Sequence, residues 1–487
     1  MTRLIFIVTF LIVCISIAQA QSDQARLIAA LLGETPIEED LQELVDQIGG
    51  RVTGSSANEK AVEWGLNKFL EAGVNAVKDP FEMPVYWNEK STSAKIEGLD
   101  FAPLMVAKYQ SPPGTYKYPL LWVGDGSPAE FENHSSDELR NSFVMVETDL
   151  CLDIDGLFAE YAHATTVEIE AYKRGVKGIV FMSSRPQKLL YHFLTMKTSE
   201  NEMPQFVMAR EDAQRCSRLL QDGVELTINV ESKADVGNSF TAHNVIAEIQ
   251  GSEFPNEVVV IGSHIDSWAL GTGANDNGCN VAMMIDIARQ MKKQNIRPKR
   301  TIRFALWNGE EQGYFGSWDY TLDHADELDQ HVMALSIDIG SGALTGFFTN
   351  GREELIQITD DVLSAVEGLG NFMQINAPIV GTDNFDFMLQ GVPNLVGNHT
   401  PQVYGINYHA SSDTYDKVDL KQLKVNSAIV GTLALGYANL DEGTRNKLQR
   451  QNRGEVQEIF DTFNLEFTMR MFNVWDPWIN GTRGLKP

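Results

Sequence analysis

The chain is poor in cysteine and in basic residues. Of its four cysteines, Cys14 lies in an N-terminal apolar run, and only Cys151, Cys216 and Cys279 follow it. Three thiols do not make a disulfide framework, and a Cys151–Cys216 bridge and three separate thiols both stay open. Lys and Arg number 39 against 66 Asp and Glu, for a formal net charge of −27. This balance excludes a nucleic-acid partner, which requires a basic surface.

Long apolar runs are scarce as well. Leu4 to Ile17 is apolar, follows Arg3 and precedes Ala18-Gln19-Ala20, the pattern of a signal peptide cleaved after Ala20. The run is shorter than the ~20 residues of a membrane span, and no later stretch is apolar enough. We therefore predict a signal peptide at 1–20, a secreted or periplasmic protein, and no membrane span.

The remaining 487 − 20 = 467 residues suffice for one large domain and one smaller domain. Residues 38–73 have a helical pattern, broken at Gly49-Gly50. Between 116 and 236, short apolar runs alternate with polar helical stretches, which predicts a separate small α/β module. From 243 onward, continuous apolar strands alternate with helices, which predicts a sheet covered on both faces. We therefore predict a large domain in two parts, 21–115 and 237–445. An insert at 116–236 separates these parts, and a tail at 446–487 packs on them.

Metal-binding residue types follow the predicted strands of the large domain. The strand VVVIGSH ends in an H-x-D pattern, a Gly-rich loop GTGANDNG opens the next helix, and a Glu-Glu pair follows TIRFALW. Each signal alone has an ordinary structural explanation, but chemistry in such sheets gathers at the carboxyl ends of strands. The candidates are His264, Asp266, Asp276, Glu310, Glu311, Asp338 and His409.

Imidazole and carboxylate together favour zinc, whereas oxygen ligands alone would favour magnesium or calcium. Five potential ligands exceed what one catalytic zinc needs, so two ions that share a carboxylate are expected, with Asp276 as the best candidate for the bridge. Asp266 is better placed to accept the other ring N–H of His264, or to orient it through the turn. Of Glu310 and Glu311, one can bind metal while the other takes a proton from water.

Cys279 is expected to be a small buried residue and not a ligand. The other histidines of the chain are expected to have surface or packing roles. These histidines are His134, His163, His192, His243, His324, His331 and His399.

Five segments resemble the motifs of the co-catalytic zinc exopeptidases, a family of aminopeptidases and glutamate carboxypeptidases: SHIDSW, GTGANDNG, RPKRTIRFALWNGEEQG, SIDIGSG and HASSDTYDKVD. GTDNFDFMLQGVP and IGGRVTGSSANEKAVEWGLNKFLEAG are similar to its carboxypeptidase Q branch. The resemblance implies an α/β fold: a three-layer α/β/α domain with a mixed, mostly parallel sheet, and a protease-associated-like α/β insert.

The resemblance also implies a role for each candidate. His264, Asp276 and Asp338 would hold one Zn²⁺, and Asp276, Glu311 and His409 a second. Glu310 would be the catalytic base, supported by Asp266. The implied reaction is hydrolysis of a terminal peptide bond in dipeptides or short peptides, by a water that two zinc ions activate. The expected partners are short peptide substrates and, in a homodimer, a second copy of the chain.

Three alternatives stay open: an aminopeptidase of the same family, a glutaminyl-cyclase-like transferase, and a binding protein without catalysis. The chain has Tyr408-His409 where the branch often has two histidines, and Asp383-Asn384 where many aminopeptidases of the family have Asp-His. The second departure weakens the aminopeptidase assignment. Deletion of most of 116–236 is expected to leave a folded, metal-binding core.

Overall fold

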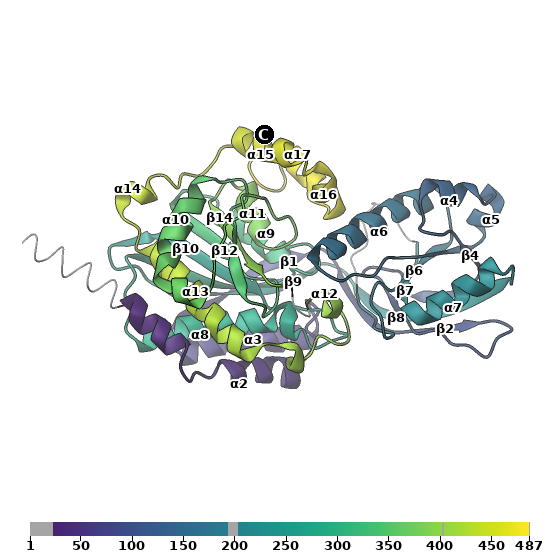
Figure 1. The fold of residues 1–487 in the computed structure, drawn as a ribbon, viewed down its shortest axis with the longest axis horizontal. Helices are drawn as coiled ribbons and strands as arrows, with labels where there is room; N and C mark the ends of the chain where they lie inside the picture. Colours follow the sequence, from purple (N-terminus) through teal and green to yellow (C-terminus); the bar gives the residue numbers. More distant parts are fainter. Residues whose placement is uncertain (1–22, 193–202, 402–403, 487) are drawn as a thin grey trace, which may run out of the picture.

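The computed structural model describes residues 23–192, 203–401 and 404–486. It contains two seven-stranded sheets, each in its own unit of the molecule (Figure 1). The predicted signal peptide at 1–20 lies outside the described residues. Among those that are described, no helix is long and apolar enough to cross a membrane.

The first sheet belongs to the unit that carries the predicted site. Its strand order is β1-β9-β11-β10-β12-β14-β13, with parallel pairing from β11 through β14 and antiparallel pairing at both edges. The strands are β1 (Asn75–Met83), β9 (Phe240–Ile249), β10 (Phe254–His264), β11 (Arg300–Trp307), β12 (His331–Ser336), β13 (Leu344–Phe348) and β14 (Asn394–His399).

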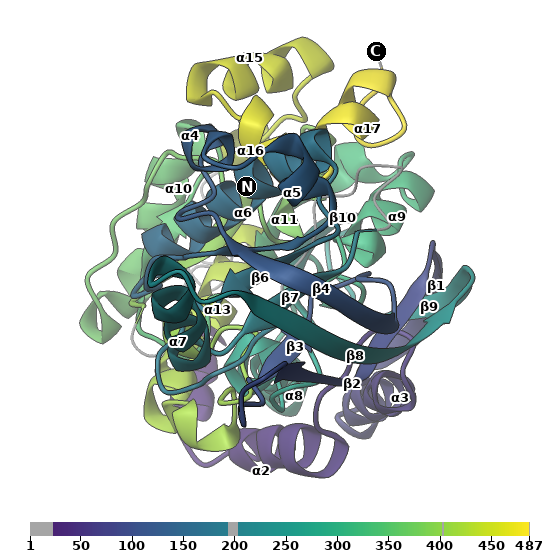
Figure 2. The same cartoon turned by 90° about the vertical axis from the view of Figure 1, so that its right-hand side faces the viewer.

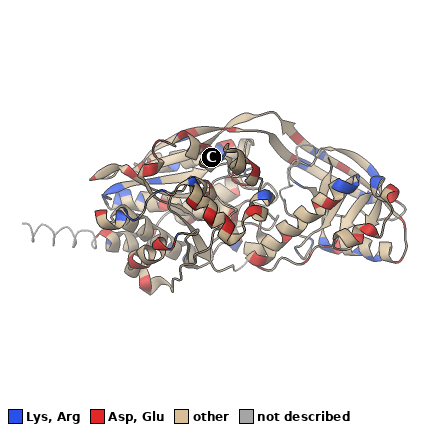
Figure 3. Ribbon diagram, turned by 90° about the horizontal axis from the view of Figure 1, so that it is seen from above, with Lys and Arg blue, Asp and Glu red and all other residues tan. Residues whose placement is uncertain are grey.

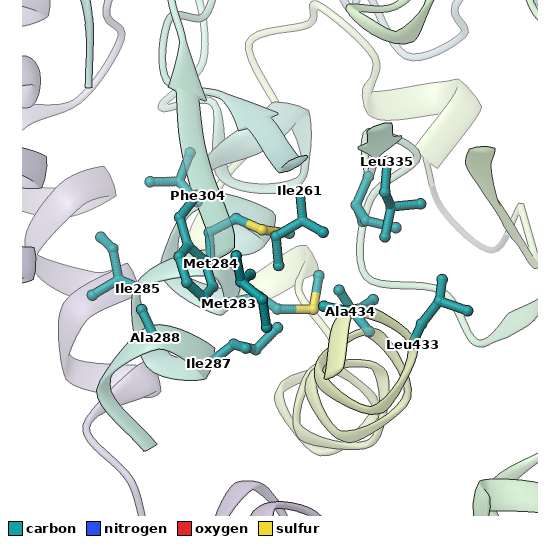
Figure 4. Packing of buried hydrophobic residues seen from close by; sticks show 14 of the residues in the cluster. Ile261, Met283, Met284, Ile285, Ile287, Ala288, Phe304, Leu335, Leu433 and Ala434 are labelled. Atoms are coloured by element: carbon teal, nitrogen blue, oxygen red, sulfur yellow. The ribbon is translucent and has the colours of Figure 1, made fainter. Parts of the chain in front are cut away.

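Helices cover both faces of this sheet, because every strand of its centre is apolar on both sides. Ile261 and Phe304 pack against one helical layer, with Met284 of α8 (Cys279–Lys293) among their neighbours (Figure 4). Val260 and Trp307 point the other way, toward a second layer. The first layer contains α2 (Ile37–Gln42), α3 (Ser56–Glu71), α8 (Cys279–Lys293), α10 (Glu354–Leu363) and α13 (Leu420–Ala438); the second contains α9 (Phe315–Asp323) and α11 (Asn384–Leu389). The predicted three-layer arrangement is therefore present.

The helical pattern predicted over 38–73 contains more than one helix. α2 continues into a short helical segment η1 (Glu43–Ile48), and α3 starts only at Ser56, capped by the Ser55 side chain, which accepts a hydrogen bond from the Asn58 N–H. The extended stretch between them carries Arg51, which is buried near the predicted site.

The second sheet begins earlier in the chain than we predicted. Its order is β2-β8-β4-β5-β6-β7-β3, and it lies between α6 (Ile154–Arg174) and α7 (Arg210–Gln221) (Figure 2). Strands β2 (Tyr86–Ile96) and β3 (Met105–Ala107), which we assigned to the large domain, pair with β8 and β7 of this sheet. The predicted start at 116 is therefore too late. The sequence hid this because β2 is mostly polar, and its partner lies about 140 residues downstream.

The other elements of this unit follow the expected alternation of strands and helices. They are β4 (Gly114–Trp122), α4 (Pro128–Glu132), α5 (Ser136–Arg140), β5 (Phe143–Val146), α6 (Ile154–Arg174), β6 (Gly178–Met182), β7 (Gln205–Met208), α7 (Arg210–Gln221) and β8 (Leu226–Gly237). The paired strands β1 and β9 of the first sheet lead directly into β2 and out of β8. A two-stranded ribbon thus joins the units.

The C-terminal tail bridges both units. It forms α15 (Arg453–Phe463), α16 (Glu466–Met471) and α17 (Trp475–Asn480), which lie over α6 and α11. Arg483 makes a buried bidentate ion pair with Asp386 of α11, with both distances 2.7 Å. Short helices α12 (Tyr404–Asn407) and α14 (Glu442–Arg445) complete the first unit. The prediction that the tail packs on the body agrees with these contacts.

Neither the charged residues nor the cysteines cluster in one part of the molecule. Acidic and basic residues are interspersed over both units in the view of Figure 3. Cys151, Cys216 and Cys279 are all buried free thiols. Cys151 and Cys216 belong to separate hydrophobic clusters of the second unit, so the structure has no bridge between them.

Candidate metal centre

The predicted metal-binding residues meet at the carboxyl edge of the first sheet. His264 ends β10, Asp338 follows β12, and the Glu310-Glu311 pair follows β11. Asp276 lies in the helical turn η2 (Ala274–Gly278) before α8, and His409 follows α12. Parallel β10, β11 and β12 end at one edge, which is why residues far apart in the sequence converge.

Two groups of three potential ligands share one carboxylate. In the first group, His264 Nε2 lies 2.9 Å from Asp338 Oδ1 and 3.2 Å from Asp276 Oδ1. In the second, His409 Nε2 lies 2.8 Å from Glu311 Oε2 and 3.3 Å from Asp276 Oδ2. Within each group, the ligand atoms lie within 4.8 Å of one another, and all five residues are buried. The two oxygens of Asp276 thus face different histidines, as a bridging carboxylate requires.

Both imidazoles are held so that Nε2 faces the carboxylates. His264 Nδ1 lies 3.1 Å from the backbone oxygen of Asp266, and His409 Nδ1 lies 3.1 Å from the backbone oxygen of His192. A carbonyl accepts only, so each Nδ1 carries a proton and Nε2 is the ring nitrogen that faces the place for a cation. The surrounding carboxylates raise the pKa of His264 well above its ordinary value, so a cation bound there would take the place of a proton on Nε2. Burial lowers the pKa of His409 to about 4, which keeps this ring neutral and able to bind a cation.

Asp266 acts on the site through its two ends. Its backbone carbonyl orients the His264 ring, which is the second of the two alternatives given for Asp266 above. Its carboxylate accepts the backbone N–H groups of Glu310 (3.4 Å) and Glu311 (3.2 Å), and the Thr53 hydroxyl (3.0 Å). Asp266 therefore fixes the turn that presents both glutamates.

The loop that carries Asp276 is held by two residues that sequence reasoning did not identify. Asp413 accepts the backbone N–H groups of Asn275 (2.8 Å) and Asp276 (3.1 Å). Arg51 donates to the carbonyls of Thr272 (2.6 Å) and Gly273 (3.0 Å). Burial raises the pKa of Asp413 to about 7 and lowers that of Arg51 to about 10. Asp413 lies in the His409 motif, which was the available signal.

The electrostatics of the cluster fit a divalent cation. Burial raises the pKa of Glu310 and of Glu311 well above the ordinary value, and neighbouring carboxylates raise both further. Asp276 Oδ2 and Glu311 Oε1 are buried and have no hydrogen-bond partner among the described residues. Buried carboxylates without donors are costly unless a cation neutralises them. The mixed nitrogen and carboxylate donors suit zinc.

A cavity of about 400 Å³ opens on the cluster. Asp276, Glu310, Glu311, Asp338 and His409 line it, together with residues of the second unit and the tail. Leu157, Phe158 and Tyr161 come from α6, and Phe472 follows α16. Tyr161 and Tyr408 bring their hydroxyls within 3.1 Å of each other across the two units. Position 408, where the chain departs from the branch, thus faces the cavity.

One of the histidines given a surface or packing role has a different position. His192 is buried, and its backbone contacts His409 in both directions: its N–H donates to the His409 carbonyl (3.2 Å), and its carbonyl accepts the ring N–H. No local pattern marks this contact, because the two residues are 217 positions apart. Because His192 lies within 116–236, this contact links the predicted insert to a proposed metal ligand.

Comparisons with known proteins agree with this geometry. Residues 244–434 match Peptidase family M28. Human carboxypeptidase Q is 26% identical over 420 residues, covering 83% of this chain and 85% of that protein. The structure of a peptidase M28 precursor from Shewanella amazonensis superposes with a TM-score of 0.78 at 24% identity, over 87% of this chain and 98% of that one. A zinc aminopeptidase from Bacillus subtilis gives a TM-score of 0.64 at 19% identity, over 82% and 93%. The predicted family resemblance and α/β fold class are confirmed, while the protease-associated nature of the insert stays a prediction.

Proposed function

We propose that this chain, a metallopeptidase whose residues 244–434 match peptidase family M28, hydrolyses terminal peptide bonds of dipeptides or short peptides with a water activated by two zinc ions. The observation that carries the proposal is the pair of ligand groups that share Asp276. His264 and Asp338 complete one group, and Glu311 and His409 the other. Zinc held there would polarise the scissile carbonyl and lower the pKa of a water molecule.

Glu310 is the proposed base. It lines the cavity beside both ligand groups but belongs to neither. Its carboxylate is therefore available to take the proton of the attacking water and to return it to the leaving amine. Asp266 holds the backbone of Glu310 and Glu311 and so keeps the base beside the ligands.

The size and lining of the cavity support an exopeptidase for short substrates. Helix α6 and Phe472 contribute apolar and aromatic side chains to the cavity lining. A volume of about 400 Å³ suits a ligand of a few residues. Phe348, Ile379 and Val396 form an apolar wall, which favours an apolar side chain next to the cleaved bond.

The charge of the lining favours a second candidate beside a carboxypeptidase Q-like enzyme. None of the described lining residues is lysine or arginine, whereas Asp153 and Asp155 lie at the start of α6. A substrate carboxylate has no cationic side chain to pair with there, while an ammonium group has anionic ones. An aminopeptidase, or a dipeptidase that grips the free amino group, is therefore the second candidate.

A panel of apolar dipeptides with free, N-blocked and C-blocked termini tests both candidates. The carboxypeptidase predicts that N-blocked members are cleaved and C-blocked members are not; the aminopeptidase predicts the reverse. A dipeptidase cleaves only members with both ends free. Glu310→Gln is the control for contaminating peptidases. Zinc-loaded protein that cleaves no member would overturn the proposed function.

We also infer that the protein acts outside the cytoplasm, on the basis of the predicted signal peptide. N-terminal sequencing of protein recovered from the medium or periplasm should begin at Gln21. A chain that retains Met1 and stays with the cytosol would contradict this inference.

A further inference from the structure

The segment of the second unit that follows β6 contacts the proposed metal ligand His409 directly. Residues 190–192 run beside residues 409–411 as a short antiparallel bridge. Tyr191 pairs with Ala410, and the Ser411 N–H donates to the Leu190 carbonyl (3.1 Å). His192 and His409 exchange the two hydrogen bonds described above. The ring of a proposed ligand is thus oriented by main chain from another unit.

The side chain of His192 is itself anchored to the second sheet. Its Nε2–H donates to Glu89 Oε2 of β2 at 2.7 Å, and both side chains are at most 5% exposed. The other oxygen of Glu89 accepts the Ala107 N–H (2.9 Å) and the Thr92 hydroxyl (2.5 Å). Glu89 therefore has fixed partners on two strands, and it fixes His192 in turn.

Aromatic contacts close the same network from the side of the first unit. The Trp268 ring lies 5.1 Å from the His192 ring and 5.8 Å from the His409 ring, centroid to centroid. Trp268 stands four residues after His264. Its ring packs against both histidine rings, so a shift of either histidine would disturb this packing.

We propose that Glu89 and His192 are positioning residues for the metal ligand His409, so that the second unit completes one of the two metal sites. The carbonyl of His192 holds the proton on His409 Nδ1 and directs Nε2 toward Glu311 and Asp276. Glu89 keeps that carbonyl in place by fixing the His192 ring. The two sites share Asp276, but the histidine of the first site is oriented separately, by the carbonyl of Asp266 within its own unit.

This inference rests on the proposed function only in requiring that the two ligand groups bind metal. A purely structural Glu89–His192 pair would stabilise the second unit without favouring one metal site over the other. Partners of metal-bound histidines typically affect metal affinity ~10–100-fold. The asymmetry between the two sites is therefore the quantity to measure.

The test uses the full mature chain with Glu89→Gln, Glu89→Asp and His192→Phe. Asp235→Asn is the matched control. It breaks the exposed ion pair between Lys90 of β2, the strand that carries Glu89, and Asp235 of β8. Zinc affinities of both sites are measured by chelator competition, cobalt-substituted protein gives the absorption spectrum of each site, and thermal unfolding of the metal-free protein reports folding.

We expect Glu89→Gln and His192→Phe to lower the zinc affinity of the site that contains His409 by ~10–100-fold. The cobalt spectrum of that site should change as well. The other site should keep its affinity, excess zinc should restore kcat, Glu89→Asp should retain more affinity than Glu89→Gln, and Asp235→Asn should match the wild type. Unchanged affinities, or equal loss at both sites in folded protein, would overturn the positioning role. Wild-type protein that binds no zinc would instead overturn the proposed function.

Discussion

The two neighbouring glutamates should respond differently to the same substitution. Glu310 lies beside both ligand groups without joining either, whereas Glu311 Oε2 is 2.8 Å from His409 Nε2. Glu310→Gln should therefore leave both metal sites filled and abolish most turnover, because an amide cannot accept the proton of water. Glu311→Gln should lower the occupancy of one site, and excess zinc should partly restore its activity.

The magnitude for Glu310→Gln follows from what surrounds it. Loss of a positioned base typically lowers the rate ~10²–10⁴-fold, or about 2.7–5.4 kcal/mol in the barrier at 1.36 kcal/mol per tenfold change. The other carboxylates of the described cavity lining belong to the ligand groups or to the start of α6. No carboxylate there can readily replace the base, so we expect the upper half of this range.

Both variants are assayed for zinc content and for dipeptide hydrolysis, with kcat and KM determined separately. For Glu310→Gln, the loss should appear in kcat with little change in KM, because substrate binding does not need the base. Asp235→Asn serves as a distant acidic-to-amide control. If Glu310→Gln loses an ion while Glu311→Gln keeps both, the assignment of base and ligand is reversed.

Three further predictions concern metal removal, the second unit and pH. Chelation should abolish activity, zinc should restore it, and elemental analysis should give two ions per chain; a single ion in fully active protein would refute the paired site. Deletion of residues 86–237 should leave the first sheet folded but weaken the site that contains His409, a change from our expectation for 116–236; a zinc affinity of that site equal to that in the intact chain would contradict it. Burial lowers the pKa of His331 to about 4, below its ordinary value of about 6.5. Its contribution to stability should therefore be complete above pH ~6.5 and disappear as the pH falls toward ~4; His331→Phe should lose less stability over that interval in urea unfolding, and a curve identical to wild type would count against this cause.

The sequence alone predicted the first unit and its candidate site, because both depend on local patterns. Continuous apolar strands such as VVVIGSH and TIRFALW predict a sheet buried on both faces, and ligand types that follow them must meet at one edge. Chemistry then limits what those residue types can do together. The bridging candidate Asp276 was identified by its position on a glycine-flanked loop, and the structure places its two oxygens toward two different histidines.

Only the tertiary structure decided which residues hold that site in place. Arg51 and Asp413 secure the Asp276 loop, and His192 orients His409 across 217 positions of sequence. Most of these bonds end on backbone atoms, which every residue carries, so no residue type marks them in advance. The start of the second unit was not predicted for the same reason. Strand β2 belongs to that unit because it is hydrogen-bonded to β8, and a partner so distant in the chain leaves no local pattern.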